Sequence, residues 1–332
     1  MFTVLVTCPP MIQRIREYKN ICEQYNFKLI CPTFTQTLTE EELIHLVPKY
    51  DAWIIGDDPA TRKVFQAGVK GNLKVAIKWG VGVDNVDFEA CKEFGIPITN
   101  TPNSFGEEVS DIAIGYLLSL TRQIHIIDSE VKKGNWYKPS GISLSNKKVA
   151  LVGFGDIGRC IAKKLLAFNL NVYVSDPACS KVNGKITYNY GHGFNSYSKE
   201  LTKLLNKINE VNIDTLEKCV NNADFIFISC ALNKHTKGMI NKDIMLLANK
   251  DVIVINVARG PIIVEKDVIE LLNSGHIKSI GFDVFENEPL KLNNPLIKFK
   301  NCIFGSHNAS NTVEAVDKVS HKTLQYIHSF FK

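Results

Sequence analysis

The sequence predicts an α/β protein with two parallel-sheet units of unequal size. Short apolar runs alternate with stretches of helical spacing along most of the chain, a pattern typical of parallel sheets covered by helices on both faces. The length of 332 residues fits about two domains. Hydrophobic residues make up 45% and charged residues 22% of the chain, which excludes disordered, fibrous and repeat-built proteins.

The first hundred residues contain four apolar runs that predict buried strands, at 2–7, 27–31, 51–56 and 73–79. Helical spacing lies between them, for example at 11–25 and 38–47. Thr39 is followed three residues later by Glu42, the capping-box pattern that marks a helix start. Strand and helix therefore alternate throughout this first unit.

A long helix is predicted over 105–122, because its apolar positions follow three-and-four spacing. Strand–helix alternation then resumes with stronger strands, at 147–154, 171–176, 224–230, 251–258, 279–285 and 301–306. A last helix is predicted over 312–331. The segment 181–213, rich in Asn, Lys, Gly, Tyr and Ser, is predicted to be a surface insertion with a short helix near 199–208. An oligomer contact or a regulatory loop remains an alternative for it.

Charge and cysteine usage favour a soluble cytoplasmic protein without a nucleic-acid or membrane partner. Lys and Arg number 39 against 34 Asp and Glu, a surplus too small to indicate nucleic acid or a membrane surface as partner. The nine cysteines are scattered and never form C-x-x-C, which argues against a disulfide framework and against a metal site. The N-terminus lacks the features of a signal peptide, and no apolar run is long enough to span a membrane.

A glycine turn carries the strongest functional signal. Gly153, Gly155 and Gly158 form a G-x-G-x-x-G motif that leaves an apolar strand and opens a helix, and Asp176 ends the next strand. This is the dinucleotide-binding (Rossmann) fingerprint in its required context. The glycines allow a tight turn, close approach to a pyrophosphate and close helix–strand packing. Asp176 suits ribose hydroxyls and would repel a 2′-phosphate, so NAD is predicted in preference to NADP.

Polar residues suited to dehydrogenase chemistry follow the later strands. Arg259, with its guanidinium, comes after the strand at 251–258, and His307 follows the strand at 301–306. Two carboxylates, Glu286 and Glu288, follow the strand at 279–285. An open α/β sheet places its ligands at the carboxyl ends of its strands, so we expect these side chains near one site.

These motifs, in this order, resemble the D-isomer-specific 2-hydroxyacid dehydrogenase family in its phosphoglycerate dehydrogenase-like branch. The likeness covers nearly the whole chain and includes the segments 79–87, 100–103 and 108–122 as well as 256–260, 283–289 and 306–308. It implies an NAD-dependent oxidoreductase that transfers a hydride between NAD(H) and a D-2-hydroxy acid or 2-keto acid. 3-Phosphoglycerate is one candidate substrate.

The resemblance also implies residue roles. Arg259 would bind the substrate carboxylate and carbonyl, His307 would take and return the hydroxyl proton, and Glu288 would stabilise the imidazolium, with Glu286 as competitor for that role. Backbone N–H groups of Gly80, Val81 and Gly82 would help hold the carboxylate. The family's cofactor contacts map onto Gly153, Gly155, Asp156, Ile157, Gly158, Asp176, Cys230, Val257 and Asp283, with Val81 facing the nicotinamide side. Cys230 could instead be a redox thiol, although a small packing residue is favoured.

The family topology implies a flavodoxin-like substrate domain at 1–100 plus 306–332, into which a Rossmann NAD-binding domain at 101–305 is inserted. The active site would lie between these domains. The helix at 105–122 and the segment 123–136 would help form a homodimer.

Two departures from the family pattern bear on the substrate. Ser306 replaces the proline that usually precedes the catalytic histidine. The loop 56–60 is acidic, whereas many phosphoglycerate-oxidising members carry an arginine there; Arg62 and Lys63 come later and could compensate. Phosphate recognition is therefore unsupported by this loop. The alternative function is an NAD(H)-responsive dimeric scaffold with little turnover.

Overall fold

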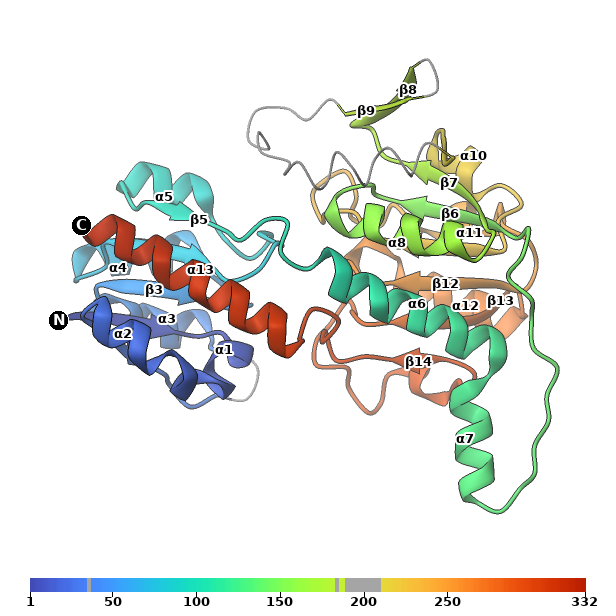
Figure 1. The fold of residues 1–332 in the computed structure, drawn as a ribbon, viewed down its shortest axis with the longest axis horizontal. Helices are drawn as coiled ribbons and strands as arrows, with labels where there is room; N and C mark the ends of the chain where they lie inside the picture. Colours follow the sequence, from blue (N-terminus) through green and yellow to red (C-terminus); the bar gives the residue numbers. More distant parts are fainter. Residues whose placement is uncertain (35–36, 183–184, 189–209) are drawn as a thin grey trace. The chain divides into compact units, whose positions relative to one another are not determined.

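The computed structural model describes residues 1–34, 37–182, 185–188 and 210–332 (Figure 1). The chain divides into two compact units, one of residues 1–105 with 311–332 and the other of residues 106–310. The sequence predicted domain boundaries after residues 100 and 305, whereas the structure places them five residues later, after residues 105 and 310. Phe105 belongs to the first unit, where its ring lies 5.6 Å from that of Trp79.

In its described residues the first unit contains a five-stranded parallel sheet in the order β2-β1-β3-β4-β5. The order is flavodoxin-like, as expected from the resemblance. The strands are β1 (Phe2–Val6), β2 (Phe27–Ile30), β3 (Ala52–Ile55), β4 (Val75–Lys78) and β5 (Ile98–Thr99). Every residue of β3 and β4 is buried, which explains why both read as uninterrupted apolar runs.

Helices cover this first sheet. They are α1 (Pro9–Gln13), α2 (Lys19–Gln24), α3 (Glu40–Leu46), α4 (Arg62–Lys70), α5 (Phe88–Phe94) and α13 (Val313–Phe331), with 3₁₀ turns η1 (Ile15–Tyr18) and η2 (Val47–Lys49). The predicted capping box is formed: Thr39 Oγ1 accepts from Glu42 N, and Glu42 Oε2 accepts from Thr39 N. The helical stretch expected over 11–25 is broken into α1, η1 and α2. The C-terminal α13 packs against β4 (Figure 1).

The second unit contains a seven-stranded parallel sheet in its described residues, in the order β10-β7-β6-β11-β12-β13-β14. The strands are β6 (Lys148–Val152), β7 (Asn171–Ser175), β10 (Asn212–Ile213), β11 (Phe225–Ile228), β12 (Val252–Asn256), β13 (Ile277–Phe282) and β14 (Ile303–Phe304). The first six in sheet order follow the Rossmann arrangement, whose order reverses between β6 and β11. A dinucleotide is expected at the carboxyl ends of these two strands.

The described helices of this second unit are α6 (Gly106–Arg122), α7 (Ile124–Lys132), α8 (Asp156–Ala167), α10 (Leu216–Val220), α11 (Lys242–Leu246) and α12 (Glu265–Ser274), with 3₁₀ turns η3 (Gly260–Ile262) and η4 (Pro295–Lys298). Helices cover both faces of the second sheet, apart from α7, which extends from the end of α6 away from the sheet (Figure 1). All residues of β11 and β12 are buried, so the core of this unit lies at the centre of the sheet.

Most of the predicted insertion at 181–213, including the short helix expected near 199–208, lies outside the described residues. Its described edges form an antiparallel hairpin, β8 (Cys179–Val182) with β9 (Lys185–Tyr188), and the edge strand β10. The hairpin was not predicted, because neither of its strands is a long apolar run.

All nine cysteines lie in the described residues as free thiols, in agreement with the absence of a disulfide pattern in the sequence. Within the ranges that the structure describes, none of the helices combines the length and the apolar character that crossing a bilayer requires.

Candidate functional site

Three loops of the second unit form the candidate catalytic site. Arg259 follows β12, Glu288 lies in the loop after β13, and His307 follows β14. These three strands are neighbours in the sheet and run parallel. Their carboxyl ends therefore lie at one edge, which brings side chains from distant parts of the chain together.

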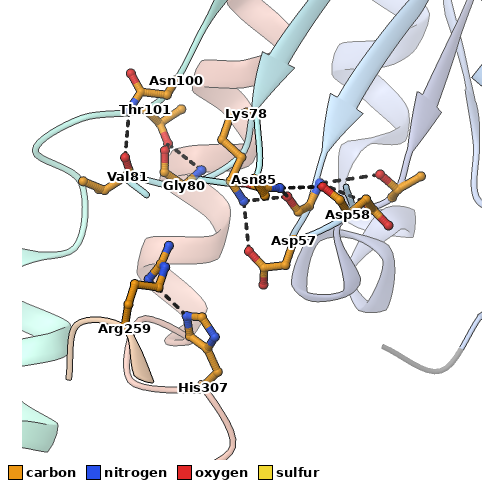
Figure 2. A network of polar contacts seen from close by, with 12 residues as sticks. Asp57, Asp58, Lys78, Gly80, Val81, Asn85, Asn100, Thr101, Arg259 and His307 are labelled. Atoms are coloured by element: carbon orange, nitrogen blue, oxygen red, sulfur yellow. Dashed lines mark hydrogen bonds and ion pairs between the residues drawn. The ribbon is translucent and has the colours of Figure 1, made fainter. Parts of the chain in front are cut away.

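The side chains of Glu288, His307 and Arg259 form a continuous chain of contacts. His307 Nδ1 lies 2.8 Å from Glu288 Oε2, and Arg259 Nη1 lies 3.4 Å from His307 Nε2 (Figure 2 draws the second contact). A neutral imidazole protonated at Nδ1 satisfies both, donating to the carboxylate and accepting from the guanidinium. The side chains of His307 and Glu288 retain 23% and 26% of their exposure, so the pair can still be reached by a ligand.

The structure distinguishes the two glutamates that the sequence left as competitors. Glu288 uses one carboxylate oxygen on His307 and accepts the Phe285 N–H with the other, at 2.9 Å. Glu286 instead accepts the N–H of Glu265, the first residue of α12, at 2.9 Å. Glu288 is therefore the carboxylate that orients the imidazole.

Asp283 fixes the backbone of the histidine loop. His307 has φ 56°, and its N–H donates to the Asp283 carbonyl oxygen at 2.7 Å. The Asp283 carboxylate, almost fully buried, accepts the N–H groups of Asn308 and Ala309 at 3.2 and 2.9 Å. The Tyr116 hydroxyl, 3.3 Å from the same carboxylate, completes the arrangement. Burial, followed by the charge of Asp283, raises the pKa of Tyr116, so its phenol stays a donor.

The sequence predicts only a cofactor contact for Asp283 and only an apolar-face position for Tyr116. Tyr116 occupies an ordinary apolar-face position of the helix, so the sequence carries no signal for its polar partner. The loop after β12 also depends on Gly260, for which the sequence predicts no role of its own. A Cβ at Gly260 would lie 1.8 Å from the carbonyl carbon of Phe285, so a side chain there would separate the Arg259 loop from the Glu288 loop.

The glycine turn has the geometry of a pyrophosphate cradle. Gly153 has φ 94°, and a Cβ there would lie 2.6 Å from Cys230 N. A Cβ at Gly158 would lie 2.2 Å from the Gly153 carbonyl oxygen, so α8 packs directly on the turn. A Cβ at Gly155 would meet nothing within 4 Å, and no side chain of the described residues caps the start of α8 there. Open space in front of first-turn N–H groups suits a phosphate.

The other predicted cofactor residues lie at the same edge of the second sheet as this turn, beyond the carboxyl ends of its strands. Asp156 and Ile157 open α8, Cys230 follows β11, and Val257 follows β12. Asp176 follows β7, and its carboxylate accepts the Phe154 N–H at 2.7 Å and the Ala178 N–H at 2.9 Å. The carboxylate is thereby held beside the glycine turn.

Cys230 shows little sign of thiol reactivity. Burial raises its pKa to about 12. Because the thiolate is the reactive form, a thiol with such a pKa is a poor nucleophile at neutral pH. Its backbone and Cβ also lie against Gly153, which favours the packing role over the redox role.

The predicted substrate loop, Gly80 to Gly82, follows β4 in the first unit. Gly80 N–H donates to Thr101 Oγ1 at 2.9 Å, and Asn100 Nδ2 donates to the Val81 carbonyl oxygen at 2.9 Å (Figure 2). The Gly80 N–H is thus already engaged. For the N–H groups of Val81 and Gly82 the structure records no acceptor among the described residues, so these two are the better candidates for holding an anion.

Comparison with known proteins identifies a family. The model of the D-isomer specific 2-hydroxyacid dehydrogenase NAD binding domain matches residues 114–206 and 189–309. The hydroxypyruvate reductase of Thermotoga maritima is 30% identical over 90% of this chain and 89% of its own length. A D-3-phosphoglycerate dehydrogenase of Methanocaldococcus jannaschii is 33% identical over 84% of this chain, but only 49% of its own length is covered. The apo-structure of Escherichia coli D-lactate dehydrogenase superposes with a TM-score of 0.78 at 25% identity, over 99% of this chain and 96% of that one.

Proposed function

Because this chain belongs to the D-isomer-specific 2-hydroxyacid dehydrogenase family and carries its NAD-binding domain, we propose that it reduces a short 2-keto acid with NADH and catalyses the reverse oxidation. The observation that supports this most directly is the Glu288–His307–Arg259 chain of contacts. A carboxylate-backed imidazole beside a guanidinium supplies both a proton carrier and an anion-binding group.

We assign one task to each side chain. The planar guanidinium of Arg259 binds the substrate carboxylate and polarises the neighbouring carbonyl. His307 Nε2 gives a proton to the carbonyl oxygen during reduction and takes it back during oxidation, while Nδ1–H stays on Glu288. The carboxylate of Glu288 stabilises the imidazolium when it forms. Val81 and Gly82 offer backbone N–H groups to the carboxylate of the acid. The turn from Gly153 to Gly158 would hold NAD(H), whose nicotinamide would supply the hydride chemistry.

Two substrate classes compete within this proposal. The Thermotoga relative favours an unphosphorylated acid such as hydroxypyruvate, and the Methanocaldococcus relative favours 3-phosphoglycerate. A panel of glyoxylate, pyruvate, hydroxypyruvate and 3-phosphohydroxypyruvate, followed by the loss of NADH absorbance, tests both. If NADH binds but none of these acids is reduced, the alternative of an NAD(H)-responsive scaffold replaces the proposal.

Asp176→Ala is expected to relax the preference for NADH over NADPH. In the wild type, the carboxylate would accept the adenosine ribose hydroxyls and repel a 2′-phosphate. The measurement is the ratio of kcat/KM for the two cofactors with one keto acid. Asp224→Ala, which changes the same charge at the opposite end of the strands, is the control. An unchanged ratio in Asp176→Ala would show that another group sets the preference.

We also propose that the protein is a homodimer. Helix α7 buries none of its own residues, and apolar side chains stand exposed on it and on the following segment: Ile124 51%, Val131 44%, Trp136 79% and Tyr137 45%. A contiguous exposed apolar surface usually marks a protein interface. Sedimentation equilibrium of the wild type should give twice the chain mass, and Trp136→Glu with Val131→Glu should give the single chain. A wild type that sediments as a monomer at micromolar concentration would contradict the proposal.

The proposed compartment is the cytoplasm. All nine cysteines are free, and seven of them are buried, so the fold neither uses nor requires disulfides. Such thiols persist in a reducing environment.

A further inference from the structure

We propose that Asp57, held in place by the buried Lys78, excludes 2-keto acids that carry a second negative charge. The enzyme would then accept an acid with an uncharged group beyond the carbonyl, such as hydroxypyruvate, and discriminate against its phosphate ester. The inference rests on the proposed function, and in particular on the loop 80–82 as part of the substrate site.

The pair consists of a buried cation beneath an exposed carboxylate. Lys78 ends β4, and its Nζ donates to the Gly56 carbonyl oxygen at 2.6 Å and to Asp57 Oδ1 at 3.0 Å (Figure 2). The Lys78 side chain is 3% exposed and that of Asp57 is 52% exposed. A ligand that approaches this pair therefore contacts the Asp57 carboxylate first, because the Lys78 ammonium is buried behind it.

The pair lies next to the proposed substrate loop. A Cβ built on Gly80 would lie 3.7 Å from Lys78 Nζ. Gly56 and Asp57 follow β3, the neighbour of β4, so both loops leave the same edge of the first sheet. Asn85 Nδ2 donates to the carbonyl oxygens of Gly56 and Asp58, at 3.1 and 2.7 Å, which ties the two loops together. An acid held by the N–H groups of Val81 and Gly82 thus has this carboxylate within electrostatic range.

The local charges do not favour a phosphate. A phosphate monoester carries about two negative charges at pH 7, and Asp57 cancels the single positive charge of Lys78. Two cations of the neighbouring helix α4 have carboxylate partners of their own: Arg62 pairs with Glu93, and Lys63 pairs with Glu40 at 3.1 Å. An uncharged hydroxyl or hydrogen at the same position meets no such repulsion.

The test compares kcat/KM for 3-phosphohydroxypyruvate with kcat/KM for hydroxypyruvate, both with NADH and on one preparation. Asp57→Asn keeps the shape of the side chain, removes its charge and leaves the Lys78 ammonium uncompensated. It is expected to raise the ratio about tenfold. Glu41→Gln removes the same charge from an exposed position on α3 in the same unit and is expected to leave the ratio unchanged. Because the ratio is internal to each sample, partial loss of folded protein does not affect it.

Two further measurements separate the charge effect from a change of shape. The double variant Asp57→Asn with Lys78→Met should lose most of the gain, because no ammonium remains to attract the phosphate. In the wild type, the ratio should rise with ionic strength, since salt screens the repulsion from a half-exposed carboxylate.

The outcomes distinguish this inference from the proposed function. A wild type that reduces hydroxypyruvate, with a ratio that Asp57→Asn leaves unchanged, overturns the inference and leaves the function intact. A wild type that prefers the phosphate ester overturns the inference as well. A wild type that reduces no 2-keto acid overturns the proposed function and, with it, this inference.

Discussion

Replacing His307 by alanine is expected to lower kcat for 2-keto acid reduction by about 10²–10⁴-fold, with NADH affinity nearly unchanged. The imidazole contacts both Glu288 and Arg259, so its loss removes the proposed proton carrier from the site. The glycine turn, by contrast, is built from β6, α8 and β11, whereas His307 follows β14. Steady-state kinetics and NADH fluorescence titration measure the two effects.

Two glutamate variants serve as a matched pair for this experiment. Glu288→Gln leaves the imidazole in place but removes the charge that stabilises its protonated form, so kcat should fall and its pH profile should shift toward acid. Glu286→Gln makes the same change two residues away, on a carboxylate that contacts α12 instead. It should behave as the wild type. A His307→Ala variant with normal turnover would remove the histidine from the mechanism.

Arg259→Lys is expected to lower kcat/KM by about 10²–10³-fold, although the positive charge is kept. A guanidinium presents two parallel N–H donors to a carboxylate, whereas an ammonium acts as a point charge on a flexible stem. A lysine ammonium that contacted Ala258 O and His307 Nε2, as Arg259 Nη1 does, would have only one N–H left for the substrate carboxylate. The loss should therefore appear in KM and in kcat together, with NADH binding preserved.

Arg62→Lys is the control, because Arg62 forms an exposed ion pair with Glu93 in the first unit. Arg62→Lys also replaces a guanidinium by an ammonium, but outside the proposed active site, so kcat/KM should stay unaltered. Wild-type kinetics in Arg259→Lys would mean that charge alone suffices, and the bidentate role would be wrong.

The sequence predicted the central strands of both sheets and the edge strands β2 and β14, and it missed β5 and β10 at the opposite edges. Strands such as β11 and β12 are buried on both faces, so each reads as an unbroken apolar run. The edge strands β5 and β10 contain only two residues each, too few for any periodic pattern. β5 pairs with β4 and β10 pairs with β7, and these pairings form only when the sheets assemble.

The residue types at the candidate site were predictable, but the contacts that position them were not. Arg259 and His307 stand directly after apolar strands, where an α/β sheet exposes its loops. Whether Glu286 or Glu288 faces the imidazole depends on the path of the loop, which local sequence does not encode. The hydrogen bond from Tyr116 to Asp283 joins residues 167 positions apart, and nothing in either neighbourhood indicates it.

The division of the chain into two compact units separates two of the proposed tasks, proton transfer and discrimination between substrates. Arg259, Glu288 and His307 all belong to the unit of residues 106–310, whereas Asp57 and Lys78 belong to the unit that contains residues 1–105. Each unit has its own hydrophobic core. On this proposal, substitutions in the unit that contains residues 1–105 can change which acids are accepted. The residues proposed to transfer the proton, in the unit of residues 106–310, then stay unchanged.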